Sequence, residues 1–281
     1  MAVIRHLTLS GASSASHREP PARPGAVPTR LMATGRDAGP AARSVGSACQ
    51  DPGPTATDVG ASALALGPVL VRFTGVAEGD MADPTGTDPT VERRRRSVVD
   101  RPWFWLHQVH GAAVVVVGSP QDETGQPADA SVTAVPGMAL AVMTADCAPV
   151  AFASPEGVIG VAHAGWRGLV AGVIEETVAA MRRTGAHSVV AALGPCIHAE
   201  CYSFGAEDLD VAEERLGPGV RGVTSNGQPS LDIPAAVRIA LGRADAALVA
   251  DVDICTACSA GYWSWRARRD QARQATVVWE P

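Results

Sequence analysis

Three consecutive apolar segments between residues 137 and 165 place the strongest constraint on the fold of this chain. They read "GMALAVMTAD", "APVAFASP" and "GVIGVAHAG". Each is short, rich in valine or alanine, and bounded by glycine or proline, a pattern typical of buried β-strands. Together they predict the core of a β-sheet.

The segments around this core mix strands and helices without a regular βαβ repeat. This order favours a mixed α/β fold, with layered β-sheets flanked by helices in a single domain, over a Rossmann sheet. Further strands are expected at 67–75, at 103–118 on either side of Gly111, at 188–195 and at 247–255. Helices are expected at 88–100, whose arginine run is interpreted as a solvated face, and at 169–183, 205–216 and 231–244.

The first part of the chain has a different composition. Residues 1–65 are rich in proline, glycine, alanine and serine and follow neither a helical nor a strand period. We interpret them as a disordered N-terminal extension, and residues 66–281 as the folded domain. His6, His17 and Cys49 therefore carry little weight as functional candidates.

The charged residues exclude several classes of protein. All basic residues are arginines, and the absence of lysine excludes Schiff-base and pyridoxal-phosphate chemistry, P-loop enzymes and kinases. A formal net charge of −6 argues against a partner that is a nucleic acid or a membrane surface. No apolar run reaches the roughly 18 residues of a membrane-spanning helix, so a cytoplasmic location is expected.

Three polar residues end apolar segments, where a buried polar group without a partner is costly. They are His110, Cys147 and His163. A thiolate and two neutral imidazoles form a natural ligand set for zinc, and three protein ligands leave the fourth position open for water or substrate. Two alternatives remain at this point: Cys147 is a nucleophile with His163 as its base, or all three are ordinary core residues.

Two neighbours of these residues are candidates for substrate contacts. Arg167 lies in "HAGWRG", where glycines allow a tight turn into the next helix, and the arginine with the helix N-terminus predicts a phosphate site. Asp146 precedes Cys147 and is a candidate for a proton carrier or a partner of a metal ligand. The competing interpretations are a solvated arginine and a strand-end cap.

The remaining cysteines offer a second possibility for metal binding. Cys255 and Cys258 form a CxxC motif, and with Cys196 and Cys201 they would make a four-cysteine zinc site. The spacing from Cys196 to Cys201 is wider than in a usual zinc knuckle, and the flanking glycines are missing. The "HAE" at 198–200 lacks the downstream Pro-Cys-x-x-Cys of the zinc deaminases. The roles of these four cysteines stay open.

Five motifs resemble those of the YfiH/DUF152 family, also called the laccase-domain family. They read "LHQVHG", "TADCAP", "AHAGWRG", "LGPCIHAECYSFG" and "LDIPAA". The resemblance implies that His110, Cys147 and His163 bind a catalytic zinc. It also implies a compact YfiH-like domain of mixed sheets and helices, distantly similar to a toxin cysteine hydrolase. The family's N-terminal motif is reduced here to "FTGVAEGDMA", and its "SYRRDG" has become "SWRARRDQ", which puts the substrate contacts of both segments in question.

The activities given to this family include purine nucleoside phosphorolysis, adenosine deamination, polyphenol oxidation and peptidoglycan editing. We expect phosphorolysis of adenosine, inosine, guanosine and methylthioadenosine to free base and ribose-1-phosphate, with adenosine deaminase activity. Nucleosides and phosphate are then the small-molecule partners. The alternatives are an amide hydrolase that edits peptidoglycan precursors, with Cys147 as nucleophile and His163 as base, and a non-enzymatic partner of cell-division proteins.

A copper-dependent laccase activity is disfavoured by the histidine count. A multicopper oxidase requires about ten imidazoles, mostly in His-x-His pairs. This chain has seven histidines and no such pair. We therefore expect zinc rather than copper, and no oligomeric state follows from the sequence.

Overall fold

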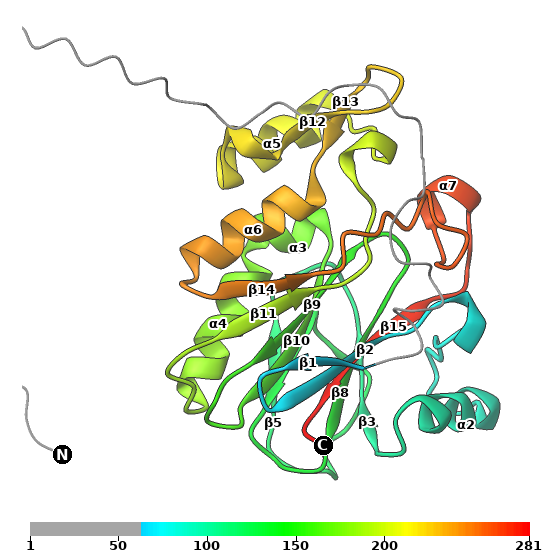
Figure 1. Cartoon of the computed structure of the whole chain (residues 1–281), viewed down its shortest axis with the longest axis vertical. Helices are drawn as coiled ribbons and strands as arrows, with labels where there is room; N and C mark the ends of the chain where they lie inside the picture. Colours follow the sequence, from blue (N-terminus) through cyan, green and yellow to red (C-terminus); the bar gives the residue numbers. More distant parts are fainter. Residues whose placement is uncertain (1–62) are drawn as a thin grey trace, which may run out of the picture. The chain divides into compact units, whose positions relative to one another are not determined.

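A computed structural model describes residues 63–281 (Figure 1). The expected disordered extension, apart from its last three residues, lies outside the described residues, as do His6, His17 and Cys49. The described chain begins with a hairpin of two strands, β1 (Leu64–Leu66) and β2 (Val69–Phe73). Two large β-sheets, two two-stranded sheets and the helices packed around them make up the described part of the chain.

The larger sheet has six strands in the order β14-β11-β9-β10-β7-β5. Its pairs are antiparallel except for β5 with β7 and β11 with β14, which are parallel. The strands are β5 (Val114–Val117), β7 (Ala130–Thr133), β9 (Ala148–Ala153), β10 (Ile159–Ala164), β11 (Val190–Leu193) and β14 (Ala247–Asp251). The central strands β9 and β10 are buried along their whole length, which explains why their sequences read as continuous apolar runs.

The second sheet has five strands in the order β1-β2-β15-β8-β3. Its pairs are antiparallel except for β3 with β8. The strands not yet given are β3 (Trp103–Phe104), β8 (Ala139–Thr144) and β15 (Gln274–Trp279). The C-terminal strand β15 therefore lies in the middle of this sheet, between β2 and β8.

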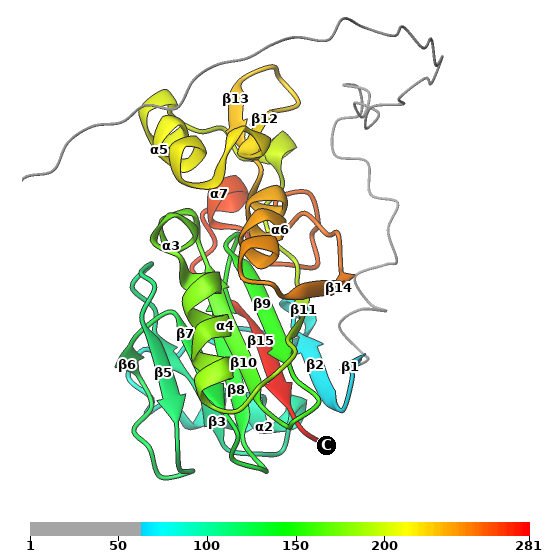
Figure 2. The ribbon, with the colours of Figure 1, turned by 90° about the vertical axis from the view of Figure 1, so that its left-hand side faces the viewer.

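The two sheets pack face to face, and their apolar side chains share one core. Phe73, Leu140 and Val278 from the five-stranded sheet pack in the same buried cluster as Val161 and Ala192 from the six-stranded sheet. Helices α3 (Trp166–Ala171), α4 (Val173–Arg183) and α6 (Ile233–Arg243) cover the other face of the six-stranded sheet, and α5 (Ala206–Leu216) packs on α3 and α6 beyond the sheet (Figure 2). Helix α2 (Pro89–Val98) lies beside the outer face of the five-stranded sheet. The fold is a layered, mixed α/β fold, as expected.

Shorter elements complete the structure. The remaining elements are η1 (Val76–Glu78), β4 (Leu106–His107), β6 (Gln126–Pro127), η2 (Ala199–Cys201), η3 (Pro218–Val220), β12 (Arg221–Val223), β13 (Pro229–Leu231) and α7 (Trp265–Arg268). Within residues 63–281, no helix has the length and apolar character needed to cross a lipid bilayer.

Two details of the predicted elements were wrong. The single helix expected over 169–183 is interrupted at Gly172, which has a positive φ of 92° and separates α3 from α4. The arginine run of α2 is also more than a solvated face. Arg95 is buried, donates to the Met81 carbonyl, and packs against the rings of Trp103 and Trp105.

Candidate metal centre

Strand register brings Cys147 and His163 together. The chain leaves the five-stranded sheet at the end of β8, crosses to the six-stranded sheet, and enters β9 directly after Cys147. Because β9 and β10 are antiparallel with Ala164 opposite Ala148, the C-terminal end of β10 lies beside the start of β9. The histidine near the end of one strand therefore faces the cysteine that precedes the other.

A buried carboxylate positions both histidines. Asp129 accepts a 2.7 Å hydrogen bond from Nδ1 of His163, so that Nε2 of this ring remains for a metal. The same carboxylate accepts the backbone N–H groups of Val109, His110 and Gly111 at 3.2, 2.9 and 2.6 Å. These bonds hold His110 in a left-handed conformation, with φ of 60°. The side chain of Asp129 thus fixes both the loop that carries His110 and the ring of His163.

The three candidate ligands form one compact group. Their ligand atoms all lie within 4.8 Å of one another, and Nε2 of His110 is 3.9 Å from Sγ of Cys147. The rings of His110 and His163 meet edge to face, with centroids 4.8 Å apart. A Cβ atom at Gly165 would lie 2.9 Å from Cδ2 of His110 and 3.1 Å from Sγ of Cys147. The group therefore depends on a glycine at this position.

The electrostatics of the group favour an ionised pair, a thiolate on Cys147 and an imidazolium on His163. Burial alone would raise the pKa of the Cys147 thiol, but the two nearby histidines outweigh this effect and lower it from its usual 9.0 to about 6. Burial likewise opposes the charged form of His163, while the Cys147 thiolate and Asp129 raise its pKa to about 9. In the absence of a metal, a thiolate and an imidazolium therefore face each other near neutral pH.

The donor set fits zinc. One thiolate sulfur and two imidazole nitrogens are ligands that zinc prefers, and a tetrahedral ion with bonds of about 2.0–2.3 Å needs donors roughly 3.3–3.8 Å apart. The 3.9 Å between His110 and Cys147 is close to this requirement. Asp129 supplies the carboxylate that commonly orients a metal-binding histidine.

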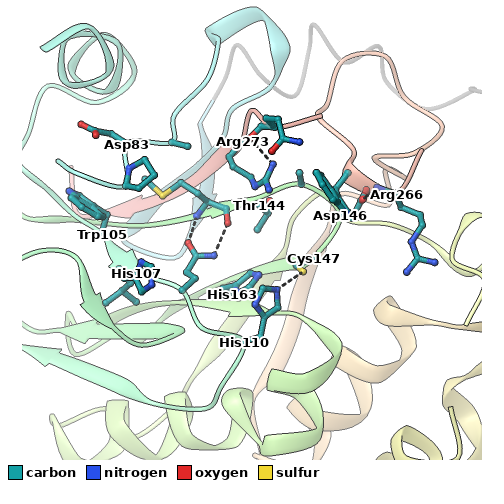
Figure 3. Close-up of a pocket in the computed structure, with 18 of the residues that line it drawn as sticks. Asp83, Trp105, His107, His110, Thr144, Asp146, Cys147, His163, Arg266 and Arg273 are labelled. Atoms are coloured by element: carbon teal, nitrogen blue, oxygen red, sulfur yellow. Dashed lines mark hydrogen bonds between the residues drawn. The ribbon is translucent and has the colours of Figure 1, made fainter. Parts of the chain in front are cut away.

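A pocket of about 650 Å³ opens beside the three ligands (Figure 3). Its volume lies in the range of small-molecule sites. Four aromatic residues and four arginines line it: Trp105, Trp166, Tyr202 and Trp265, with Arg95, Arg167, Arg266 and Arg273. Flat rings and guanidinium groups are suited to a planar base and an anionic group.

The structure places both predicted substrate residues in the wall of this pocket. The exposed guanidinium of Arg167 lies over the ring of Trp166, 4.4 Å from its centroid. The carboxylate of Asp146 is occupied by two donors, at 2.7 Å from the hydroxyl of Thr256 and at 2.6 Å from the N–H of Arg266. Asp146 therefore ties the loop of Cys147 to the C-terminal part of the chain.

Sequence reasoning missed three residues of this site. Asp129 follows "QPA" and reads as a turn residue, although its flanking "ADASV" is apolar enough to suggest burial. Gln108 pairs through its amide with both backbone groups of Met143, at 2.7 and 2.8 Å, and so anchors the His110 loop to β8. Thr144 lines the pocket, and its buried hydroxyl has no hydrogen-bond partner among the described residues.

The family model for multi-copper polyphenol oxidoreductase laccase matches residues 77–280. The chain belongs to this family. Among the relatives of this chain, the following two are named purine nucleoside phosphorylase. The protein from Streptomyces coelicolor is 42% identical over 73% of this chain and 86% of its own length. The one from Pseudomonas aeruginosa is 37% identical over 68% of this chain and 81% of its own length.

Solved structures agree with this membership of the laccase family. A Neisseria meningitidis protein assigned to DUF152 superimposes with a TM-score of 0.66 and 30% identity, covering 77% of this chain and 96% of its own. YlmD from Geobacillus stearothermophilus gives a TM-score of 0.65 and 28% identity, covering 79% and 93% of the two chains. The resemblance to YfiH/DUF152 proteins is therefore confirmed, together with the fold that it implied.

Proposed function

We propose that this chain is a zinc-dependent purine nucleoside phosphorylase. It would convert adenosine, inosine, guanosine and methylthioadenosine to free base and ribose-1-phosphate, with adenosine deamination as a second activity. The observation that carries the proposal is the Cys/His/His group at the wall of a pocket rich in aromatic rings and arginines. The names of the relatives from Streptomyces coelicolor and Pseudomonas aeruginosa support the purine nucleoside phosphorylase activity.

His110, Cys147 and His163 would hold the zinc ion, which when bound supplies a Lewis acid and lowers the pKa of a coordinated water. Zinc is proposed rather than copper, although the family description refers to copper. The described residues include one thiolate and two imidazoles in this group, a set that suits zinc, and the whole sequence has too few histidines for a multicopper centre.

The pocket residues would bind and orient the two substrates. A purine ring can stack on the pocket tryptophans, a contact worth about 1–3 kcal/mol per base. Arg167 and Arg266 can donate to phosphate oxygens in the fork geometry that guanidinium groups provide. The hydroxyl of Thr144, which is buried without a partner among the described residues, is a candidate donor or acceptor for the nucleoside.

The test is an assay of purified, metal-quantified protein on adenosine, inosine and methylthioadenosine, with and without phosphate. We expect release of free base and ribose-1-phosphate that depends on both phosphate and zinc. Release of ribose without phosphate, or no turnover by zinc-loaded protein, would contradict the proposal. Deamination is measured separately as inosine formed from adenosine.

The phosphate-binding role of Arg167 has its own test. Arg167→Ala removes a charged donor worth about 1.5–3 kcal/mol, so the KM for phosphate should rise by roughly tenfold or more. Arg238→Ala is the matched control, because Arg238 is an exposed arginine paired with Asp251 and does not line the pocket. An unchanged KM for phosphate in Arg167→Ala would remove Arg167 from the site.

A second candidate function is an amide hydrolase that edits peptidoglycan precursors. One observation favours it: Cys147, His163 and Asp129 also form a nucleophile, base and orienting acid, with the thiol pKa lowered to about 6. Full activity on an amide substrate in strong chelator, by protein without bound metal, would support the hydrolase over the metalloenzyme. Loss of the amide hydrolysis when the metal is removed would exclude the metal-independent hydrolase.

We place this activity in the cytoplasm, with nucleosides and phosphate as partners and without a nucleic-acid or membrane partner. The acidic net charge of −6 supports the exclusion of nucleic acid.

A further inference from the structure

A band of four aromatic side chains lies along one wall of the pocket. The ring of Phe204 contacts the rings of Trp166 and Tyr202 edge to face, with centroids 5.2 Å away in both cases. Trp265 continues the band on α7, where it lines the same pocket and is 41% exposed. We call these four residues the aromatic band. It reaches from the turn after β10, which follows His163, to the exposed edge of the pocket.

Three of the four rings carry an arginine. The guanidinium carbons lie 4.4, 4.5 and 5.4 Å from the ring centroids, for Arg167 over Trp166, Arg266 over Tyr202 and Arg269 over Trp265, respectively. Stacking of this kind holds the plane of a guanidinium group and leaves the N–H groups at its edge free to meet an acceptor. The band therefore presents positive charge in a fixed orientation.

This positive charge is not neutralised by ion pairs. Within residues 63–281, Arg167, Arg266 and Arg269 have no carboxylate partner, whereas the exposed Arg182 and Arg238 each pair with an aspartate. The side chain of Arg266 makes one hydrogen bond, from Nη1 to the Ser203 carbonyl at 2.7 Å, which leaves its other N–H groups for a ligand. An anion bound along the band would therefore meet donors that no other group occupies.

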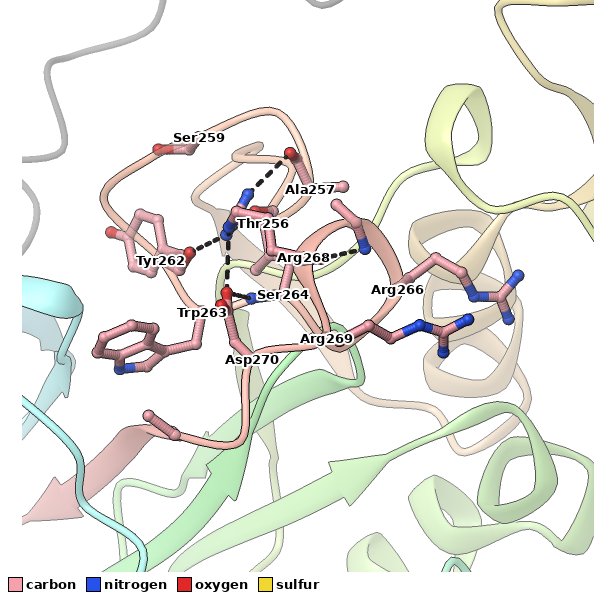
Figure 4. Close-up of polar contacts among 12 residues, drawn as sticks. Thr256, Ala257, Ser259, Tyr262, Trp263, Ser264, Arg266, Arg268, Arg269 and Asp270 are labelled. Atoms are coloured by element: carbon pink, nitrogen blue, oxygen red, sulfur yellow. Dashed lines mark hydrogen bonds and ion pairs between the residues drawn. The ribbon is translucent and has the colours of Figure 1, made fainter.

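Two of the arginines extend from the same side of α7. Arg266 and Arg269 are three residues apart, the spacing that places side chains on one face of a helix, and the N–H of Arg269 bonds the Trp265 carbonyl at 3.0 Å. Figure 4 shows both side chains leading away from the preceding turn, whereas Arg268 points into it and donates to its carbonyl groups. One face of α7 thus offers two guanidinium groups beside an exposed indole ring.

This end of the band is fixed relative to the candidate metal centre. The backbone N–H of Arg266 donates to Oδ2 of Asp146 at 2.6 Å, and the residue after Asp146 is Cys147. The hydroxyl of Thr256 donates to the other oxygen of the same carboxylate at 2.7 Å. A ligand that reaches the metal centre would therefore find Arg266 and its neighbours on α7 at a defined position.

The number of arginines exceeds what a nucleoside and inorganic phosphate require. One anion site is enough for those two substrates, and Arg167 at the Trp166 end of the band meets this need. The Trp265 end adds Arg269, which lies beyond the pocket lining. Guanidinium groups match the oxygens of a phosphate group in their fork geometry. The additional charge is therefore suited to an anionic group that the nucleoside itself carries.

We propose that Trp265, Arg266 and Arg269 form a subsite for the phosphate group of a nucleoside 5′-phosphate, so that the pocket binds nucleotides as well as nucleosides. The subsite lies in the segment where this chain departs from the family motif, with "SWRARRDQ" in place of "SYRRDG". The inference rests on the proposed function in one respect, because it takes the occupant of the pocket to be a purine nucleoside.

The experiment compares the binding of inosine and inosine 5′-monophosphate by calorimetry. The full chain is loaded with zinc and kept free of inorganic phosphate, so that no phosphorolysis occurs. We expect the monophosphate to bind about tenfold more tightly than inosine, because charged hydrogen bonds to the phosphate are added. This preference should fall as salt is raised from about 0.05 to 0.5 M, while the Kd of inosine stays the same.

Three variants assign the preference to α7. Arg269→Gln keeps a polar side chain without the charge, and should reduce the preference to about threefold or less without changing the Kd of inosine. Arg269→Lys retains the charge and should keep most of the preference. Arg183→Ala is the matched control, because Arg183 is also exposed but lies on α4 and does not line the pocket.

The outcomes separate this inference from the proposed function. Equal Kd values for the two ligands in the wild type would overturn the subsite, as would an equal loss of preference in Arg269→Gln and Arg183→Ala. Failure of the proposed function looks different: inosine binds, but no hypoxanthine is released when phosphate is added, and the preference for the monophosphate is still measurable. Binding of neither ligand would overturn both.

Discussion

Asp129 accepts four hydrogen bonds from the metal-ligand region, three from backbone N–H groups and one from a histidine ring. In Asp129→Asn, an amide NH₂ would face a backbone N–H group, and the loop of His110 would lose its anchor. We expect the zinc affinity of the candidate metal centre to fall by roughly 10–100-fold, which competition with a chelator measures.

The control for this change is Asp122→Asn. Asp122 also accepts two backbone N–H groups, from Gly118 and Ser119, in a turn that does not line the pocket. Its replacement should leave zinc affinity unchanged. An equal fall in zinc affinity in both variants would mean that Asp129 does not position the metal ligands.

Gly165 offers a second test at the scale of one residue. Its φ of −69° is allowed for alanine, so Gly165→Ala would act only through the contacts of the added Cβ with His110 and Cys147. We expect loss of zinc from the candidate metal centre with little change in the unfolding temperature of the metal-free protein, measured by metal analysis and thermal unfolding. Gly205→Ala is the matched control, because Gly205 also caps a helix but a Cβ atom added there would meet no neighbouring group within 4 Å.

The pKa values of Cys147 and His163 predict how zinc binding depends on pH. Between about pH 6 and 9 the thiol is already ionised, but His163 carries a proton on the nitrogen that the metal needs. Binding should therefore release about one proton from this pair. Affinity should rise about tenfold per pH unit in this window and level off above it, because His163 is then neutral and the metal no longer has to displace a proton.

Calorimetry at about pH 7.5 in buffers of different ionisation enthalpy measures this proton directly. A binding enthalpy that does not change with the buffer would contradict the thiolate–imidazolium pair. The same pair affects the stability of the metal-free protein. Its raised His163 pKa contributes stability that is complete below the unfolded value near 6.5 and is lost as pH rises through about 9.

The chemistry of the site could be predicted only in part from the sequence. His110, Cys147 and His163 stood out because each ends an apolar segment. Asp129 did not, since a single aspartate shortly after Gln-Pro has the same local pattern as a turn residue, and its burial results from pairing between β7 and β10. Thr144 was missed because a threonine at the end of a strand is common.

At the scale of elements, β15 shows how much one short strand contributes to the stability of the fold. Val278 is fully buried between the two sheets, where it packs with residues of both. Val278→Ala should lower the free energy of unfolding by about 2 kcal/mol through lost burial and the cavity left behind. Denaturant unfolding measures this change in the free energy of unfolding. Val249→Ala on β14 is the control, because Val249 is 58% exposed and its replacement removes little buried surface.

Strands and helices were predicted where the spacing of apolar residues within the segment itself indicates them. They were missed where no such pattern exists within the segment. The three apolar runs became β8, β9 and β10, and the helices at 205–216 and 231–244 became α5 and α6. β7 and β15 were not expected, because "ASVT" is short and "QATVVW" follows an arginine-rich segment. Their pairing with distant strands, rather than local pattern, determines that they are strands.

For the whole molecule, metal binding should appear as a gain in stability. Zinc that binds only the folded chain adds about 2.7 kcal/mol at a free concentration one hundred times its Kd. For a chain of this size, that corresponds to a rise in Tm of roughly 5–10 °C. Thermal unfolding with and without zinc tests this rise in Tm, and His110→Ala should lose the part of it that depends on the candidate metal centre.

The class of fold followed from the sequence, but its layering did not. A mixture of strands and helices without a βαβ repeat indicated a mixed α/β domain, which is what the chain forms. The division of the strands into two stacked sheets depends on which strand crosses between them. Nothing in "TADC" marks the point where the chain leaves one sheet for the other.

That crossing has a consequence for how this family can diversify. Cys147 lies on the connection between the sheets, whereas His163 belongs to the six-stranded sheet. The distance between Sγ of Cys147 and the ring of His163 therefore depends on how the two sheets are aligned. Repacking of the core between the sheets would therefore change the spacing between Cys147 and His163, whereas much of the pocket wall comes from loops and from the short helices α3 and α7. Residues of the pocket wall can therefore vary while the intersheet core keeps the spacing of the three candidate ligands constant.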